Sequence, residues 1–268
     1  MKLAENRLVV AVPLIPIIYL LITISPPLLL FLLVAAAILR AQFEFYKLYY
    51  QAKPPPPLYF GLTCGCLLLC LFYLNPAPLW FVASFFLILM AILIFNLFFF
   101  REIRLALLDS AVLYTGVFYL AGLLGHLILM RQRPGGRPFI LFLLFVVWGN
   151  DAGAYYIGRA LGGWKLYPAI SPNKTMSGSI GGLIIGSLAG AFCKIAFHLP
   201  FSWLEVIMLS LVLVAAGQLG DLVESMFKRS AGIKDSSGLI PAHGGLFDKL
   251  DGVAFAAPLL YYYLMIAA

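Results

Sequence analysis

Charged residues are scarce in this sequence. Only 11% of the 268 residues are Asp, Glu, Lys or Arg, whereas 63% are hydrophobic, and the mean hydropathy is +1.00. A soluble domain of this length needs far more polar surface, so the composition excludes an ordinary water-soluble protein. The sequence therefore predicts a membrane protein whose chain crosses the bilayer several times.

Cysteine is also rare, with four copies, and basic clusters are missing although the net charge is +7. Cys64 and Cys66 lie two residues apart, so on a helix they would point in different directions, and no His or acidic residue is near them in the sequence. The cysteines are thus typical of small packing residues. Without a basic run or an RNA-binding motif, the positive charge indicates contact with anionic lipid headgroups and no nucleic-acid partner.

Long apolar segments fill most of the chain. A helix needs roughly 20 apolar residues to cross a bilayer. Nine segments approach that length, at 8–24, 28–46, 58–74, 79–99, 105–130, 138–157, 178–198, 202–227 and 252–267. The alternating ten-residue strands that a membrane β-barrel needs are absent. The predicted fold class is all-α, a polytopic integral membrane protein with about nine transmembrane helices.

Lysine and arginine are distributed unevenly among the predicted loops. With nine spans, 14 of these residues fall on the side that holds the N-terminus, and only Arg131, Arg133 and Arg137 fall on the other. Because cytoplasmic loops are enriched in Lys and Arg, we expect a cytoplasmic N-terminus and a location in the cell (inner) membrane. The polar loops 158–177 and 228–251 would both be cytoplasmic, since two spans separate them.

The two halves of the chain differ in polarity. Residues 1–130 are expected to form a scaffold of transmembrane helices, and Asp109 inside one span is as readily explained by a partner in the bundle as by a function. Residues 131–268 contain the polar loops and form the predicted catalytic region. A glycine recurs there at every fourth position of one span, at Gly178, Gly182, Gly186 and Gly190. Such a stripe allows close packing of another helix, either within the chain or in a homodimer.

The loop 158–177 has features of an anion site. Ser171-Pro172 fits a helix N-cap followed by proline at the first helical position, which would put Lys174 and Thr175 in the first turn. A helix start offers free N–H groups to an anion. On this loop alone, phosphate binding and simple helix capping are equally acceptable interpretations.

The densest charge in the chain lies at 221–251. Five of the 11 acidic residues and four cations fall there: Asp221, Glu224, Asp235, Asp248 and Asp251, with Lys228, Arg229, Lys234 and Lys249. The first two carboxylates, Ser225 and Lys228 have the spacing of one helix face. Clustered carboxylates suit Mg²⁺, whereas no Cys and His set suits zinc, and neighbouring cations suit phosphate oxygens. We therefore predict a metal-assisted phosphate-handling site at a membrane surface.

The spacing within this stretch resembles the signature of the phosphatidate cytidylyltransferases, also called CDP-diacylglycerol synthases. The matching positions are Ser225-x-x-Lys228-Arg229, Lys234-Asp235 and Pro241-x-His243-Gly244-Gly245-x-x-Asp248-x-x-Asp251. Upstream positions that also match include Asp151, Gly158, Lys165, Ser171-Pro172 and Lys174-Thr175. The similarity covers roughly residues 148–251. Two departures are Lys249, where the family usually has Arg, and Ser177, where it usually has Glu.

The resemblance implies transfer of the cytidylyl group of CTP to phosphatidate, giving CDP-diacylglycerol and pyrophosphate in phospholipid biosynthesis. It implies Mg²⁺, held by Asp221 and Asp248 with Glu224 and Asp251 as the next candidates; a second cation is left open. The implied catalytic residues are Asp221, Asp248, Lys228, Arg229 and His243. The implied substrate contacts are Asp151, Arg159, Ser171, Lys174, Thr175, Ser225, Lys234, Asp235, Gly244, Gly245 and Lys249.

The sequence is also compatible with two other functions. A CTP-dependent polyprenol or phytol kinase would transfer the γ-phosphoryl group and release CDP into solution. A transporter of anions or lipids is the non-enzymatic alternative, and it predicts interrupted spans and an internal repeat, neither of which is evident in the sequence.

Overall fold

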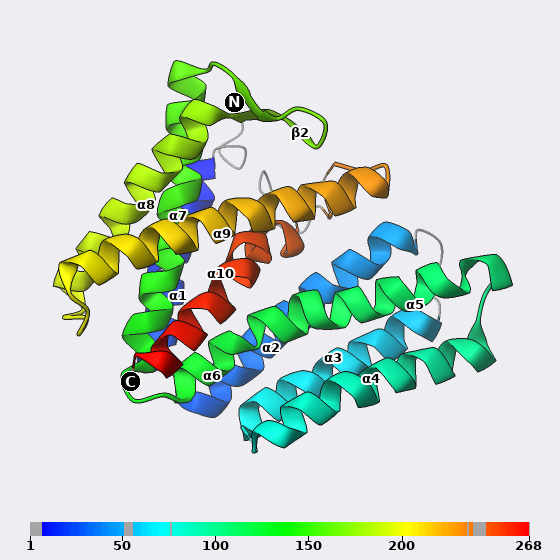
Figure 1. Ribbon diagram of the computed structural model, residues 1–268. Coiled ribbons are helices and arrows are strands. Elements are labelled where there is room, and N and C mark those ends of the chain that lie inside the picture. The colour runs from blue at the N-terminus through cyan, green and yellow to red at the C-terminus, as the bar shows by residue number, and fades with distance from the viewer. Residues whose placement is uncertain (1–6, 51–55, 76, 235, 238–244, 268) are drawn as a thin grey trace.

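The computed structural model describes residues 7–50, 56–75, 77–234, 236–237 and 245–267, with side chains from Ile15 onward. Its helices are α1 (Arg7–Ile24), α2 (Pro27–Tyr49), α3 (Pro56–Leu74), α4 (Pro78–Phe99), α5 (Ala106–Thr115), α6 (His126–Gln132), α7 (Gly136–Leu161), α8 (Met176–Ala196), α9 (Trp203–Ser230) and α10 (Phe247–Ile266). A 3-10 turn at Ile103–Leu105 precedes α5, and a π-helical segment at Gly116–Gly122 follows it. Two short strands, β1 (Lys165–Tyr167) and β2 (Ser171–Thr175), form the β structure of these ranges (Figure 1).

Each of the nine expected spans corresponds to a helix or to a run of helices. Seven segments of the described chain are long and apolar enough to cross a membrane, among them the 30-residue run Ile103–Gln132 that contains α5 and α6. The helices α1 and α10 account for the other two expected spans. The prediction of an all-α polytopic membrane protein is confirmed, with the β1–β2 ribbon as a small addition.

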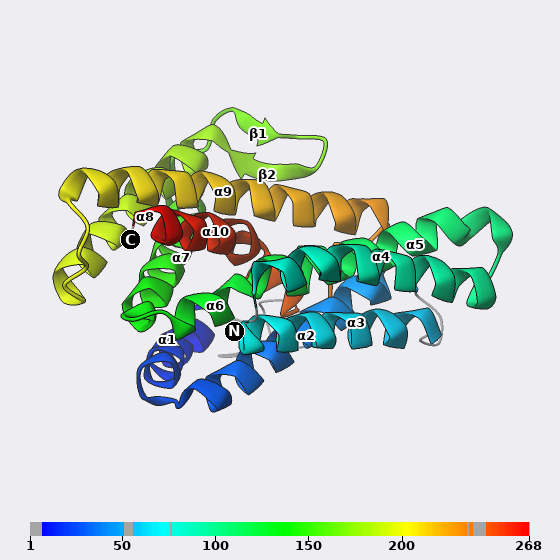
Figure 2. The ribbon, with the colours of Figure 1, turned by 60° about the horizontal axis from the view of Figure 1, so that its bottom comes forward.

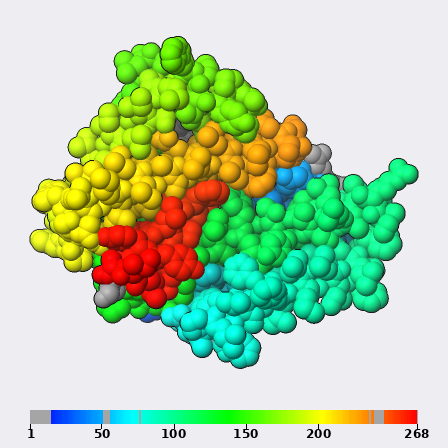
Figure 3. Space-filling model, in the orientation of Figure 1, coloured from blue at the N-terminus to red at the C-terminus, as the bar shows by residue number. Residues whose placement is uncertain are grey.

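The helices form two groups that meet at α10. Helices α2 to α6 lie side by side as one group, and α7 to α10 form the other (Figures 1 and 2). Within the second group, α7 packs along α8, and α9 contacts both α8 and α10. Helix α10 also contacts α2 and α6 of the first group. Figure 3 shows α9 as a band across one face, between the α7–α8 pair and α10. This arrangement places the charged ends of α9 and α10 where the two groups meet.

Helix α4 forms an outer wall of the first group. Of its 22 residues only Ile92 and Asn96 are buried, and large apolar side chains such as Leu79 and Phe98 are each 73% exposed. An apolar surface of this extent is stable in lipid and would aggregate in water. The exposed face of α4 therefore supports the membrane assignment made from composition.

A buried polar network joins three helices of the first group. The Gln42 amide donates to Tyr46 Oη and to the Gly61 carbonyl, both at 2.9 Å, and Tyr46 Oη donates to the Leu113 carbonyl at 2.9 Å. The Tyr46 ring occupies the space that a Cβ would need at Gly61 and at Gly116. In a medium without water such groups must find partners inside the protein, so this network fixes α2 against α3 and α5.

Asp109 has an ion-pair partner inside the helix bundle, which is one of the two interpretations that the sequence offered. Its buried carboxylate pairs with Arg101, at 2.5 Å from Nη2 and 3.1 Å from Nε. A two-pronged pair of this kind neutralises a carboxylate inside the apolar bundle. Within the described chain, the ion pair of Asp109 is with Arg101, in the α4–α5 corner.

The glycine stripe of α8 packs within the chain. A Cβ at Gly178 would lie 2.7 Å from the Ala154 carbonyl oxygen of α7, and one at Gly186 would lie 2.5 Å from Val214 of α9. The stripe thus lets α8 approach the backbone of α7 and the side chains of α9. Of the two interpretations of the stripe, close packing inside one chain is the one that the structure displays.

The arginines that depart from the charge distribution also have a structural explanation. Arg131 Nη2 donates to the Ser25 carbonyl at the end of α1, at 3.2 Å, and Arg133 Nη2 donates to the Leu264 carbonyl near the end of α10, at 2.9 Å. The last carbonyls of a helix have no partner within it, so cations are favourable there. These two arginines bind carbonyls near helix ends, and this role explains why cations occur on the side opposite to the polar loops.

Candidate active site

The loop after α7 folds into a ribbon instead of starting a helix. Strands β1 and β2 pair antiparallel, with Lys165 opposite Thr175 and Tyr167 opposite Ser171. Helix α8 begins only at Met176, and Thr175 is its N-cap, accepting a hydrogen bond from the Gly178 N–H at 3.1 Å. The prediction that Ser171 caps the helix, with Lys174 and Thr175 in its first turn, is therefore wrong. Pairing with β1 keeps residues 171–175 extended, and this extension moves the cap four residues along the chain.

The corrected cap gives a testable difference between two hydroxyl side chains. Thr175→Val should lower the free energy of unfolding by about 1 kcal/mol, because the Gly178 N–H loses its acceptor at a buried position. Ser171→Ala should change it by less than about 0.5 kcal/mol, since Ser171 is only partly buried and caps nothing. Thermal unfolding of both purified variants in the same detergent measures the difference. Equal losses would contradict the assignment of the cap to Thr175.

Three carboxylates meet between α9 and α10. One oxygen each of Asp221, Glu224 and Asp251 lie within 4.8 Å of one another. The first two are one turn apart on α9, as their spacing predicts, and Asp251 faces them from the start of α10. Glu224 is 1% exposed, whereas the other two are partly exposed. Three negative oxygens so close together repel one another unless a cation lies among them.

Lys228 connects this trio to Asp248. Its Nζ lies 2.7 Å from Glu224 Oε1 and 2.8 Å from Asp248 Oδ1. The other Asp248 oxygen accepts from the Gly245 N–H at 2.7 Å and from Ser236, at 2.8 Å from Oγ and 3.2 Å from N. The two oxygens of Asp248 thus already have four donor groups, and the carboxylate lies outside the trio. The prediction that Asp221 and Asp248 are the first pair of metal ligands remains untested, and the geometry favours Asp251 and Glu224 beside Asp221.

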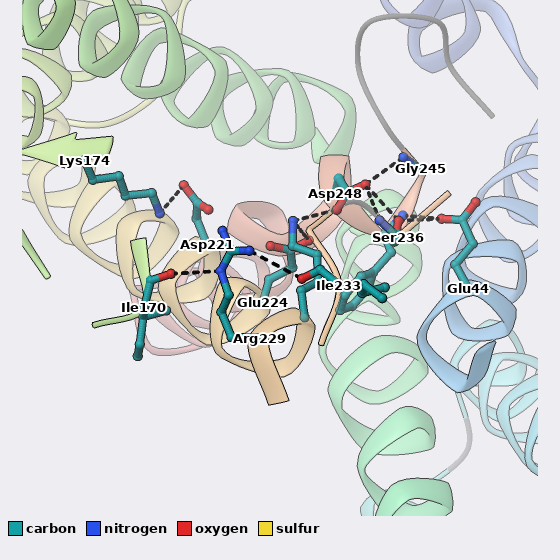
Figure 4. A network of polar contacts seen from close by, with 12 residues as sticks. Glu44, Ile170, Lys174, Asp221, Glu224, Arg229, Ile233, Ser236, Gly245 and Asp248 are labelled. Atoms are coloured by element: carbon teal, nitrogen blue, oxygen red, sulfur yellow. Dashed lines mark hydrogen bonds and ion pairs between the residues drawn. The ribbon is translucent and has the colours of Figure 1, made fainter. Parts of the chain in front are cut away.

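Lys174 joins the ribbon to α9. Its Nζ lies 2.5 Å from Asp221 Oδ2, and both side chains remain partly exposed, at 26% and 38% (Figure 4). Arg229, further along α9, donates to the Ile170 carbonyl of the same ribbon at 3.3 Å. The two polar loops that the sequence places on one side of the membrane therefore meet in space, and a cation of one loop lies against the carboxylates of the other.

Asp151 lies at the α7 edge of the same region. It accepts a hydrogen bond from the Asn150 amide at 3.1 Å, and Asn150 in turn accepts one from Gln218 at 2.8 Å. Gln218 also exchanges hydrogen bonds with Ser179 of α8, donating to its carbonyl at 3.0 Å and accepting from its hydroxyl at 2.5 Å. These amides tie α7, α8 and α9 together at Gln218, which lies one turn before Asp221 on α9, so hydrogen bonds between helices hold the neighbourhood of the trio.

A carboxylate of the first helix group also takes part. Glu44 on α2 is 1% exposed and accepts from the Phe247 N–H at 2.9 Å and from the hydroxyls of Ser237 and Ser236 at 2.7 and 3.4 Å (Figure 4). Arg40 lies 3.2 Å away on the same helix. Sequence reasoning missed this residue, although a carboxylate within an apolar span is by itself a signal of function.

The remaining predicted residues are more dispersed. Arg159 is exposed and donates to Tyr155 Oη at 3.1 Å, and Lys234 and Lys249 are exposed as well. Ser225 is partly buried on α9. Gly245 lies against Glu44 and both loop serines, so closely that a Cβ there would overlap them. Asp235, His243 and Gly244 lie outside the described residues.

Comparison with known sequences shows which family the chain belongs to. The sequence profile of the cytidylyltransferase family matches residues 5–267, almost the entire chain. The chain belongs to the cytidylyltransferase family. The resemblance noted from the 221–251 stretch is thereby confirmed, and the family match extends across the first half, where the sequence alone offered only hydrophobicity.

Individual members of the family agree with this assignment. The chain is 40% identical over 157 residues to a phosphatidate cytidylyltransferase of Staphylococcus saprophyticus, 36% over 174 residues to one of Bacillus subtilis and 46% over 150 residues to one of Brucella suis. These alignments cover 59%, 65% and 56% of this chain and 60%, 62% and 55% of the relatives. The chain thus spans about three fifths of the length of the curated relatives it matches.

The two departures from the family pattern have different surroundings. Ser177 donates to the Gly162 carbonyl and lies 3.0 Å from the Thr175 hydroxyl, so it ties the start of α8 to the end of α7. Lys249 is exposed on the first turn of α10, two residues before Asp251 of the trio. The Ser177 hydroxyl has thus taken a local structural role, whereas Lys249 keeps a positive charge near the carboxylates without the fork geometry of Arg.

Proposed function

We propose that this protein transfers the cytidylyl group of CTP to phosphatidate, forming CDP-diacylglycerol and releasing pyrophosphate. The observation that carries the proposal is the meeting of Asp221, Glu224 and Asp251 with Lys174 and Lys228 beside apolar helices. Phosphatidate and CTP are both highly anionic, so an enzyme that joins them must gather cations around two sets of phosphate oxygens. Membership of the cytidylyltransferase family supports CTP as the nucleotide.

The carboxylate trio fits a Mg²⁺ ion. Oxygens that share an octahedral Mg²⁺ lie about 3 Å apart when adjacent and about 4 Å apart when opposite, given bond lengths near 2.1 Å. Oxygens within 4.8 Å of one another need only a small closure to reach this geometry. The trio consists of hard oxygen ligands, which Mg²⁺ prefers to nitrogen or sulfur. When bound, the ion would neutralise phosphate oxygens and orient them.

The proposed reaction is a displacement at the α-phosphorus of CTP. A phosphatidate oxygen attacks the α-phosphorus of CTP, and the bond from that phosphorus to the bridging oxygen of the β-phosphate breaks, so pyrophosphate leaves. A phosphate monoester is already a nucleophile, so the protein needs no covalent intermediate. Lys174, Lys228 and Arg229 are assigned to phosphate oxygens, and Asp151 and Arg159 are assigned to the opposite wall of the site. His243 keeps its predicted role in orienting substrate.

The lipid would reach this site along the membrane. The trio lies at the ends of α9 and α10, next to helices whose outer faces are apolar. A phosphate headgroup held there leaves the acyl chains in the hydrocarbon layer. The charge distribution supports the cytoplasmic face of the cell membrane for this end of the molecule.

The fate of a labelled nucleotide tests the proposal. Purified protein in detergent with phosphatidate, Mg²⁺ and CTP labelled in the cytidine should place the label in the organic phase, with one pyrophosphate released per label. Label that remains in water as CDP, together with a newly phosphorylated polyprenol or phytol when that alcohol is supplied, would indicate the kinase instead. Anion flux in liposomes without CTP consumption would indicate a transporter.

A further inference from the structure

Glu44 links the first helix group to the carboxylates of α9 and α10 through hydrogen bonds on both sides of segment 238–244. It accepts from Ser236 and Ser237 on one side and from the Phe247 N–H on the other. Asp248 follows Phe247 directly and shares the Ser236 hydroxyl with Glu44. The connected groups are Glu44, Ser236, Asp248, Lys228 and Glu224, ending in the trio.

The burial of Glu44 makes these contacts energetically important. A carboxylate that is 1% exposed in an apolar helix is costly unless donors or cations surround it. Arg40 is its one cationic neighbour in the described chain, and the side chain of Arg40 is 36% exposed. The other donors to Glu44 in the described residues are the hydroxyls of Ser236 and Ser237 and the Phe247 N–H. Stabilisation of the Glu44 charge therefore depends on these groups keeping their positions beside α2.

We propose that Glu44 is a positioning residue for the transfer reaction. It fixes the start of α10, and thereby the orientation of Asp248 and Lys228 toward Glu224. This inference rests on the proposed function. It also gives residues 1–130 a role beyond scaffolding, because Glu44 lies in the half of the chain that was expected to contribute only helices. Outer contacts of this kind commonly change metal affinity or activity 10- to 100-fold.

Two substitutions on the same helix separate positioning from stability. Glu44→Gln should lower kcat about 10- to 100-fold and raise the Mg²⁺ concentration for half-maximal rate, with KM for CTP within about threefold. The matched control is Gln42→Met, one half-turn away and equally buried, which removes hydrogen bonds to Tyr46 of α2 and Gly61 of α3. Gln42→Met should lower the unfolding temperature and leave kcat unchanged.

A measurement without turnover keeps the inference separate from the proposed activity. In Glu44→Gln, amide hydrogen exchange at Phe247 and Asp248 should accelerate at least tenfold, while exchange in α8 stays as in the unaltered protein; Gln42→Met should show no such local change. Ser236→Ala, which removes the hydroxyl shared by the two carboxylates, should shift both kcat and exchange in the same direction. Unchanged exchange and kcat in Glu44→Gln and Ser236→Ala would overturn the inference. Accelerated exchange in a protein that never makes lipid-linked cytidine would retain the Glu44 contact and reject the proposed function.

Discussion

Replacing Asp221 or Asp251 by Asn should abolish lipid-linked cytidine formation, with a loss of at least about 100-fold in kcat. Each change removes one negative oxygen donor from the trio and leaves side-chain size almost unchanged. The amide would still fill its space, so the helices should assemble normally. The assay is label transfer from CTP into the organic phase across a range of Mg²⁺ concentrations, with size-exclusion chromatography to verify that each variant remains folded.

The control for this experiment is Glu205→Gln. Glu205 belongs to the same helix but lies in its first turn, where it completes a capping box with Ser202 and accepts from Tyr263 Oη at 2.7 Å. Its loss should cost stability at that end of α9 and leave turnover intact. If Asp221→Asn and Asp251→Asn keep full activity at low Mg²⁺, the trio is not the metal site. Loss of activity in Asp221→Asn and Asp248→Asn, with full activity in Asp251→Asn, would instead favour the original pairing of Asp221 with Asp248.

Lys228→Met should be the most destabilising single change near the site. It leaves Glu224 and Asp248, which are 1% and 11% exposed, without the ammonium group that lies between them. Removing one partner of a buried ion pair costs about 3–5 kcal/mol, because the remaining charge stays desolvated. For a chain of this size the unfolding temperature should fall by roughly 10 °C, as measured by thermal unfolding in detergent.

Two further variants show whether the unpaired charge is the cause. Adding Glu224→Gln to Lys228→Met should recover part of the lost stability, since Asp248 retains its donors from Ser236 and Gly245. Lys165→Met, an exposed lysine of the ribbon, is the control for loss of a positive charge and should change the unfolding temperature little. A stable Lys228→Met protein would mean that Glu224 and Asp248 find other partners or are protonated.

The sequence predicted the local features of this protein well. Each of the nine apolar segments coincides with a helix or a run of helices, and seven segments of the described chain are long and apolar enough to cross a membrane. Hydropathy reveals such segments directly, because the hydrocarbon thickness imposes a minimum length. Asp221 and Glu224 lie on one face of α9, since a spacing of three residues sets this in any α-helix. The error at Ser171 arose where two good capping residues, Ser171 and Thr175, compete. The pairing of β2 with β1 decided between them, and that pairing is absent from the local pattern.

By itself, then, the sequence determined the membrane class, the spans and the concentration of charge at 221–251. Only the tertiary structure decided which carboxylates meet. Asp251 joins Asp221 and Glu224, Asp248 is held by Lys228 and backbone donors, and Glu44 reaches the same region from roughly 200 residues away in the chain. The physical reason is that helical periodicity fixes neighbours within one helix, whereas contacts between helices depend on how their buried surfaces pack.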